Sequence, residues 1–176
     1  MKAIFLDRDE TLNHDPGYIN NPDIIKLKNG VVEGLTLLRD AGYTFFILTN
    51  QSGVNRGKIL PEELEAVHDR LLSLLNEHGI HIEKIYFCPH VDEDKCLCRK
   101  PLPGLLEQAL DEYEIDIPGS YIIGDRLRDI IPGEKYSIKG ILAYRKISVD
   151  EPVPGNFIYE AEDLLDAARH ILKDSG

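Results

Sequence analysis

Short apolar segments alternate with segments of helical period along most of the chain, and this alternation constrains the fold more than any other feature. The apolar segments are continuous rather than alternating with polar residues, as in TFFIL over Thr44–Leu48. Strands covered by helices on both faces of a parallel sheet have this composition, whereas strands with one face in water alternate. The pattern predicts an α/β fold with a doubly wound, Rossmann-like parallel sheet.

Apolar periodicity and helix-breaking residues place the individual elements. Gly42 ends the first expected helix, and Pro61 opens the second at its first turn. One face of the first helix consists of Val31, Leu35, Leu38 and Ala41. The expected core face of the second helix consists of Leu64, Val67, Leu71 and Leu74. The other expected helices are Leu105–Tyr113 and Ala161–Leu172. The expected strands are Ala3–Leu6, Thr44–Leu48, Ile85–Phe87, Tyr121–Ile123 and Ile141–Tyr144.

Length and composition indicate one domain over residues 1–176, with no linker and no repeat. The net charge of -11 argues against a nucleic-acid binder, although a local basic cluster could still capture a small anion. No apolar run approaches the roughly 18–20 residues of a membrane span. We therefore expect a cytoplasmic protein without a membrane or nucleic-acid partner. A monomer is expected because no large apolar face is left unpaired.

Polar clusters follow three of the expected strands, where ligands bind in sheets of this kind. Asp7 to Thr11 follows the first strand, Thr49 to Gly53 the second, and Gly124-Asp125 the fourth. Three carboxylates at one edge would repel one another without a cation, and Mg²⁺ prefers oxygen ligands together with a substrate phosphate. The sequence predicts a Mg²⁺ site that includes Asp7, Asp9 and Asp125.

All three cysteines lie in the loop of residues 88–98, with one histidine between them. Cys88, His90, Cys96 and Cys98 form a Cys₃His set, which is typical of a closed structural zinc site. The alternative is three reduced thiols in a core, but the loop is polar and offers them little core to join. We expect Zn²⁺ here, holding Arg99-Lys100-Pro101 at the mouth of the site.

Taken in order, these motifs resemble the haloacid dehalogenase superfamily. The matching residues are Asp7-x-Asp9-x-Thr11, Thr49, Lys100 and Gly124-Asp125-x-x-x-Asp129. The resemblance implies a phosphatase in which Asp7 is the nucleophile, Asp9 the general acid and base, and Asp125 a Mg²⁺ ligand. In this superfamily the Asp7 carboxylate and the Asp9 backbone carbonyl also bind the metal. The segments between the motifs are too short for a separate cap domain.

The same resemblance implies roles for the remaining motif residues. Thr49 would hold a phosphoryl oxygen, and Lys100 would neutralise charge on the phosphoryl group and the nucleophile. Asp129 would orient Lys100 or a metal-bound water. As alternatives, Asp9 and Asp129 could be helix or turn caps, Thr49 a capping hydroxyl and Lys100 a solvated surface lysine.

With its cysteine loop, the chain resembles the heptose bisphosphate phosphatases of this superfamily and their near relatives, the histidinol-phosphate phosphatases. That likeness implies a small anionic sugar phosphate as the substrate. The residues expected to bind it are Asp15, Pro16, Gly17, Tyr18, Asn50, Gln51, Ser52, Arg99 and Arg126.

Three departures from the family pattern bear on the substrate. Glu10 stands where the family usually has glycine, the gap between His90 and Cys96 is short, and Pro132 interrupts the helix expected after Asp129. The alternatives are a phosphatase for histidinol phosphate, for another small molecule or for nucleic-acid 3′ ends, and a non-catalytic zinc-stabilised binding module. The five histidines other than His90 are expected at the surface or as caps: His14, His68, His78, His81 and His170.

Overall fold

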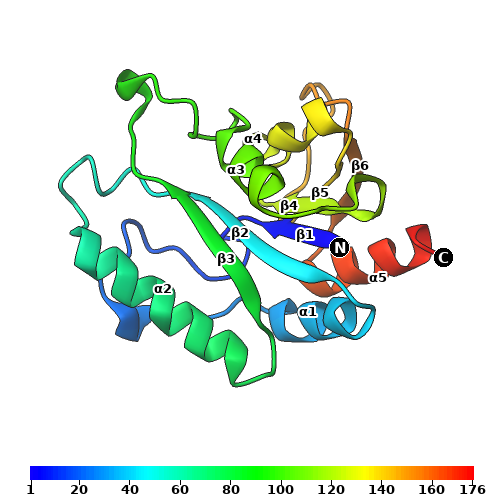
Figure 1. Ribbon diagram of the computed structural model, residues 1–176, viewed down its shortest axis with the longest axis horizontal. Coiled ribbons are helices and arrows are strands. Elements are labelled where there is room, and N and C mark those ends of the chain that lie inside the picture. Colours follow the sequence, from blue (N-terminus) through cyan, green and yellow to red (C-terminus); the bar gives the residue numbers. More distant parts are fainter.

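The computed structural model describes residues 1–176 and contains a six-stranded sheet with helices on both faces (Figure 1). All neighbouring strands run parallel, in the order β3-β2-β1-β4-β5-β6. The strands are β1 Ala3–Leu6, β2 Thr44–Asn50, β3 Ile82–Cys88, β4 Tyr121–Gly124, β5 Lys139–Ala143 and β6 Phe157–Ala161. The helices are α1 Val31–Asp40, α2 Pro61–Asn76, α3 Gly104–Glu112, α4 Leu127–Ile130 and α5 Leu164–Asp174.

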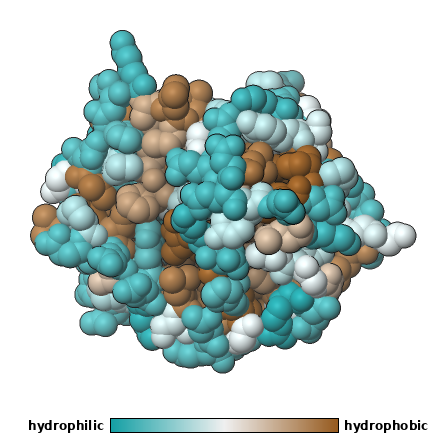
Figure 2. All heavy atoms as spheres, viewed as in Figure 1, coloured by the Kyte–Doolittle hydropathy of each residue, from teal (hydrophilic) through white to brown (hydrophobic).

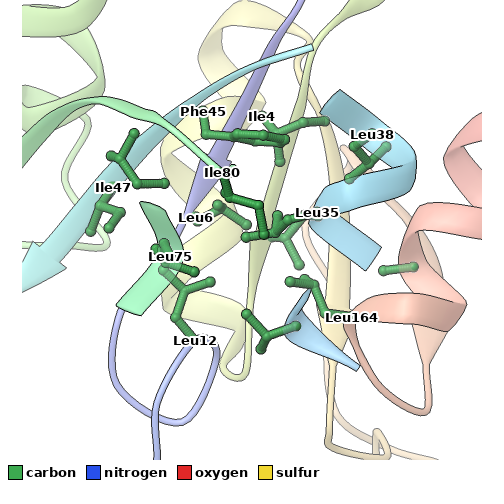
Figure 3. Packing of buried hydrophobic residues seen from close by; sticks show 14 of the residues in the cluster. Ile4, Leu6, Leu12, Leu35, Leu38, Phe45, Ile47, Leu75, Ile80 and Leu164 are labelled. Atoms are coloured by element: carbon green, nitrogen blue, oxygen red, sulfur yellow. The ribbon is translucent and has the colours of Figure 1, made fainter. Parts of the chain in front are cut away.

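Two hydrophobic clusters separate the layers. Helices α1, α2 and α5 cover one face of the sheet, and α3 and α4 cover the other (Figure 1). In the larger cluster, side chains of β1 and β2 meet Leu35 of α1, Leu75 of α2 and Leu164 of α5 (Figure 3). The smaller cluster packs Phe5 and Phe46 against Leu105 and Leu106 of α3. Both faces of the central strands are buried, which is why their sequences read as continuous apolar runs.

The expected parallel α/β sheet is confirmed, and all five expected strands are present. The sixth strand, β6, was missed, and its last residue, Ala161, was wrongly assigned to the terminal helix, which begins at Leu164. β6 lies at the edge of the sheet and is only partly buried, so it lacks the continuous apolar run that marks the central strands.

Helix α2 presents a slightly different face to the core than expected. Leu75 is fully buried there, whereas Leu74 is only partly buried at the edge of the cluster. The expectation of a surface His68 was wrong, because its side chain is 8% exposed and its ring lies 5.8 Å from that of Phe87. The interruption expected at Pro132 is confirmed: α4 has four residues and continues as a 3-10 helix over Ile131–Tyr136.

Strand β1 is the topological switch point of the sheet. Its neighbours are β2 on one side and β4 on the other. The helix after β2, α2, lies on one face and the segment after β4, α4, lies on the other. The carboxyl ends of β1, β2 and β4 therefore border a crevice, the usual position of a ligand in such sheets.

Hydrophilic residues cover most of the surface in Figure 2, and hydrophobic residues are visible in separate patches. None of the helices combines the length and the hydropathy that crossing a membrane would require.

Gly34 permits the close contact between α1 and α5. A Cβ atom at this position would lie 2.5 Å from the carbonyl oxygen of Leu164. In an exposed helix, Gly→Ala stabilises by about 1 kcal/mol. Here we expect Gly34→Ala to lower the free energy of unfolding by about 1–3 kcal/mol, because overpacking against a backbone atom forces the helices apart.

Urea unfolding followed by circular dichroism measures this change. Glu33→Ala, on the exposed side of the same helix, serves as the control and should change the free energy by no more than about 0.5 kcal/mol. A stabilised Gly34→Ala protein would contradict the packing argument.

Candidate active site

The polar residues at the ends of β1, β2 and β4 line a cavity of about 210 Å³. Only two of its seventeen lining residues are hydrophobic. Pro16, Arg99 and Lys100 were expected at the site but are not among the lining residues. The expected residues that do line it are Asp7, Asp9, Asp15, Gly17, Tyr18, Thr49, Asn50, Gln51, Ser52, Asp125, Arg126 and Asp129.

A buried ammonium group lies directly beneath this cavity. Lys100 Nζ is 2.6 Å from Asp7 Oδ1 and 2.9 Å from Asp129 Oδ1, and it donates to the Leu48 carbonyl at 2.7 Å. All three charged side chains are at least nine-tenths buried. A buried charge is costly unless it is paired and hydrogen-bonded, and here each one is. Lys100 therefore joins the end of β1 to the start of α4.

Local backbone contacts set the positions of this cluster. The Asn50 side chain accepts from the Lys100 N–H at 2.9 Å and donates to the Lys100 carbonyl at 3.0 Å. Asp129 caps the first turn of α4 by accepting from the Arg126 N–H at 3.0 Å. Gly124 is required because a Cβ atom there would lie 2.2 Å from Asp129 Cβ. Asn50 thus holds Lys100 through the backbone, a role that the sequence did not indicate.

Three carboxylates gather at the base of the cavity. Oxygens of Asp7, Asp125 and Asp129 lie within 4.8 Å of one another, whereas the Asp9 side chain is not in this group. Burial and the charge of Asp129 raise the pKa of Asp7 to about 7, although Lys100 opposes the shift. Burial and Asp129 also raise the pKa of Asp125 to about 6. Asp7 and Asp129 share the buried Lys100, and Asp125 lies beside them, so a divalent oxygen-preferring cation such as Mg²⁺ fits the donor set.

The Asp9 carboxylate is instead held by a buried arginine that the sequence analysis did not single out. Arg8 Nε donates to Asp9 Oδ1 and Arg8 Nη2 to Asp9 Oδ2, both at 2.9 Å, and Arg8 is 1% exposed. Asn13 and Gln51 donate to the same carboxylate at 3.0 and 2.8 Å. The planar, two-bond contact with Arg8 fixes the orientation of the Asp9 carboxylate at the cavity wall.

Gln51 connects Asp9 with Thr49. Its Nε2 donates to Thr49 Oγ1 and to Asp9 Oδ2, both at 2.8 Å, and its Oε1 accepts from Arg8 at 3.1 Å. Thr49 is 1% exposed yet lines the cavity. One amide side chain therefore sets the orientation of a hydroxyl and a carboxylate at the same wall.

The two arginines expected at the substrate have different surroundings. Arg99 Nε is 2.5 Å from Asp92 Oδ1, and its Nη1 donates to the His90 carbonyl, so the side chain is directed toward the cysteine loop. Arg126 lines the cavity, and its side chain is 58% exposed, with only a long contact of 3.6 Å to Asp125. Of the two, only Arg126 is placed to meet a ligand in the cavity.

The cysteine loop brings its four expected donors together. Sulfur atoms of the three cysteines are 3.0–3.6 Å apart, and His90 Nδ1 is 3.4 Å from the sulfurs of Cys88 and Cys98. None of the cysteines forms a disulfide. A tetrahedral Zn²⁺ with Zn–S of about 2.3 Å separates its sulfurs by roughly 3.8 Å. Although burial opposes ionisation, backbone N–H groups lower the pKa of Cys96 to about 7.

Comparison with known proteins identifies the family of this chain. The family model of haloacid dehalogenase-like hydrolases matches residues 5–135. The chain belongs to this family.

Its curated relatives include heptose bisphosphate phosphatases. The probable D-glycero-D-manno-heptose-1,7-bisphosphate 7-phosphatase of Thermoplasma volcanium is 42% identical over 126 residues, which cover 72% of this chain and 86% of the relative. The D-glycero-beta-D-manno-heptose-1,7-bisphosphate 7-phosphatase of Pasteurella multocida is 36% identical over 169 residues, which cover 91% and 92%.

A solved structure is similar over nearly the whole chain. The D,D-heptose 1,7-bisphosphate phosphatase from B. bronchiseptica, complexed with magnesium and phosphate, has a TM-score of 0.90 and 32% identity, and 99% of each chain is covered. The haloacid dehalogenase type of fold is thereby confirmed for this chain.

The raised pKa values of Asp7 and Asp125 predict a pH-dependent metal affinity. A proton must leave Asp7 before its carboxylate can bind Mg²⁺, so binding strengthens as the pH rises toward the pKa of about 7 and levels off above it. We expect Mg²⁺ to bind about tenfold more weakly at pH 6 than at pH 8. Isothermal titration calorimetry at constant ionic strength measures this, and a pH-independent dissociation constant would contradict it.

Proposed function

We propose that this protein is a Mg²⁺-dependent phosphomonoesterase that removes the 7-phosphate of D-glycero-D-manno-heptose 1,7-bisphosphate. The observation that carries the proposal is the buried Lys100–Asp7–Asp129 cluster at the base of a polar cavity. The relatives and the similar structure described above support this choice of substrate. Histidinol phosphate or another small phosphate ester is the second candidate.

In the proposed reaction, a carboxylate oxygen of Asp7 attacks phosphorus, and the bond from phosphorus to the sugar oxygen breaks. Asp9 gives a proton to that departing oxygen. Asp9 then takes a proton from water, whose oxygen attacks the phosphorus of the aspartyl phosphate and releases inorganic phosphate and free Asp7. Arg8, Asn13 and Gln51 hold Asp9 at the cavity wall. Each Asp9 oxygen accepts from two N–H groups, so one of these hydrogen bonds opens when Asp9 carries the proton.

Lys100, beneath the cavity, would offset negative charge on the phosphoryl group as it is transferred. Lys100 Nζ already contacts Asp7 at 2.6 Å, and the Thr49 hydroxyl lies at the cavity wall to donate to a phosphoryl oxygen. Asp7 and Asp125 would hold Mg²⁺ together with the Asp9 carbonyl, and Asp129 would orient Lys100. The metal supplies electrostatic stabilisation of the phosphoryl oxygens when bound.

The sugar and its second phosphate would meet the rim of the cavity. Asp15, Gly17 and Tyr18 form one side, and Ser52 and Arg126 are the further polar groups within reach. Arg126 can bind the second phosphate through two parallel N–H bonds, which a lysine cannot provide. Arg99 could do so only after leaving Asp92.

A non-catalytic zinc-stabilised module is the candidate from another class. Such a module would have no use for a lysine and two aspartates that are buried together at a desolvation cost. The negative net charge disfavours a 3′-phosphatase acting on nucleic acid, which would need a basic track along the strand.

Asp7→Asn tests the nucleophile. The amide is nearly isosteric but cannot attack phosphorus, so we expect steady-state hydrolysis to fall to the rate without enzyme while substrate still binds. Phosphate release and calorimetric binding give the two readouts. Asp23→Asn, at an exposed position outside the cavity, is the control and should keep wild-type kinetics. Turnover by a pure Asp7→Asn preparation would refute the assignment.

We further propose that Cys88, His90, Cys96 and Cys98 hold a structural Zn²⁺. All four donors are protein side chains, so no position is left open for catalysis. Cys98 lies two residues before Lys100, which means that the metal would also hold the chain that delivers the buried ammonium group.

Cys98→Ala should lose zinc and stability together, because one of four ligands is removed. Elemental analysis should find well under half of the wild-type zinc content, and the melting temperature should fall. Leu97→Ala, whose side chain is 80% exposed in the same loop, should change neither. Unchanged zinc content in Cys98→Ala would contradict the assignment.

Phosphate release across a small substrate panel tests the proposed function itself. The panel contains both anomers of the heptose 1,7-bisphosphate, fructose 1,6-bisphosphate, histidinol phosphate and a 3′-phosphorylated oligonucleotide. We expect kcat/KM for one heptose anomer to exceed all others by a hundredfold or more, about 2.7 kcal/mol of transition-state discrimination. Preference for another member of the panel would overturn the proposed substrate.

A further inference from the structure

Glu10 combines a costly backbone conformation with two hydrogen bonds. Its φ is 59°, in the left-handed region that residues with a Cβ atom rarely adopt. Its Oε1 accepts from the Asp15 N–H at 2.6 Å, and its Oε2 accepts from Lys28 Nζ at 2.7 Å. A glycine would adopt this φ without strain but could make neither bond. Glu10 also lines the cavity, and strained backbone conformations cluster at functional sites.

The segment of residues 15–20 is held at two points: Ile19 is buried in the larger hydrophobic cluster, and the Asp15 N–H is hydrogen-bonded to Glu10. Backbone hydrogen bonds hold the base of this loop, from His14 to Lys26 and from Lys28 to Leu12. Beyond the base, the Asp15 N–H is the only group of residues 15–20 that is hydrogen-bonded to the rest of the chain. Asp15, Gly17 and Tyr18, which face the cavity, all lie in this segment.

The Lys28 side chain, which donates to the other Glu10 oxygen, is itself held in place by its surroundings. Its side chain is 11% exposed, and Nζ lies 4.3 Å from the ring centroid of Tyr144, close enough for a cation–π contact. The Tyr144 hydroxyl donates to the Asn29 carbonyl at 2.7 Å. Glu10 therefore ties the Asp15–Tyr18 stretch, which precedes the buried Ile19, to Lys28 and through it to the Tyr144 ring, just after β5.

We propose that Glu10 is a specificity-determining residue, which positions the Asp15–Tyr18 wall of the cavity against the sugar by tying it to Lys28. This inference rests on the proposed function for the identity of the sugar phosphate. The connection from Asp15 through Glu10 to Lys28, called the tether below, can be tested without any substrate. Glu10 does not touch the reacting atoms in this assignment, so its effect should fall on KM more than on kcat.

Three variants separate the tether from the charge. E10G removes both hydrogen bonds and relieves the left-handed strain, whereas E10Q keeps an oxygen that can accept from the Asp15 N–H. K28M removes the anchor and leaves the bond to Asp15 in place. Hydrogen–deuterium exchange reports on residues 15–20, and steady-state kinetics compare the heptose bisphosphate with p-nitrophenyl phosphate, which has no sugar to meet the wall.

We expect exchange of the Asp15 amide to be about tenfold or more faster in E10G and within about threefold of wild type in E10Q. KM for the heptose bisphosphate should rise about tenfold in E10G, well beyond any rise for p-nitrophenyl phosphate. K28M should give an intermediate rise. The E10G/K28M double variant should be no worse than E10G, because both act through one connection.

Wild-type exchange and wild-type KM in E10G would overturn the proposal. So would an E10Q protein as impaired as E10G, which would assign the effect to charge, or an equal rise in KM for both substrates. If the wild-type protein does not hydrolyse the heptose bisphosphate, the proposed substrate fails. The exchange experiment, and the kinetics with whichever sugar phosphate of the panel is hydrolysed, then still decide whether the tether exists.

Discussion

The buried contact of the Lys100 ammonium group with Asp7 and Asp129 is the interaction on which the rest of the structure depends. An uncompensated charge at this depth would be strongly destabilising, so the three groups require one another. They come from three separated parts of the chain, which only the strand order around β1 brings together. Asn50 and the cysteine loop deliver the lysine, and the short helix α4 delivers Asp129. A local disturbance in any of these segments would reach the site through this contact.

Charge is distributed unevenly across the cavity. On one side Asp7 and Asp129 share Lys100, Asp125 has only a long contact of 3.6 Å to Arg126, and burial raises the pKa of Asp7 and Asp125. On the other side Asp9 has an arginine and two amide donors to itself. The first side is short of positive charge and suits a divalent cation, while the second is already satisfied by protein groups. Two carboxylates only two residues apart thus have different surroundings, which suit the separate roles proposed for them.

The side of the cavity that Asp15, Gly17 and Tyr18 form is built from a short loop. Between Asp9 and the start of β2 at Thr44, the chain forms only a short 3-10 helix and α1. A wall of this kind has few backbone hydrogen bonds of its own, so single side chains decide how firmly it is held. Glu10 and Lys28 form such a connection, and the left-handed backbone at Glu10 shows that the bond is made despite a local cost.

The sequence by itself determined the parallel α/β sheet, five of its six strands, the positions of the polar clusters at the strand ends, and the cysteine and histidine set. These follow from local patterns, because a strand buried on both faces must be apolar and ligand-binding residues must follow strand ends. Only the tertiary structure decided which partner each polar side chain has. It paired Asp9 with Arg8, directed Arg99 to Asp92, buried His68 and placed β6 at the sheet edge. The physical reason is that a charged or edge residue is satisfied by whichever group the fold brings within about 3 Å, and neither periodicity nor spacing encodes that neighbour.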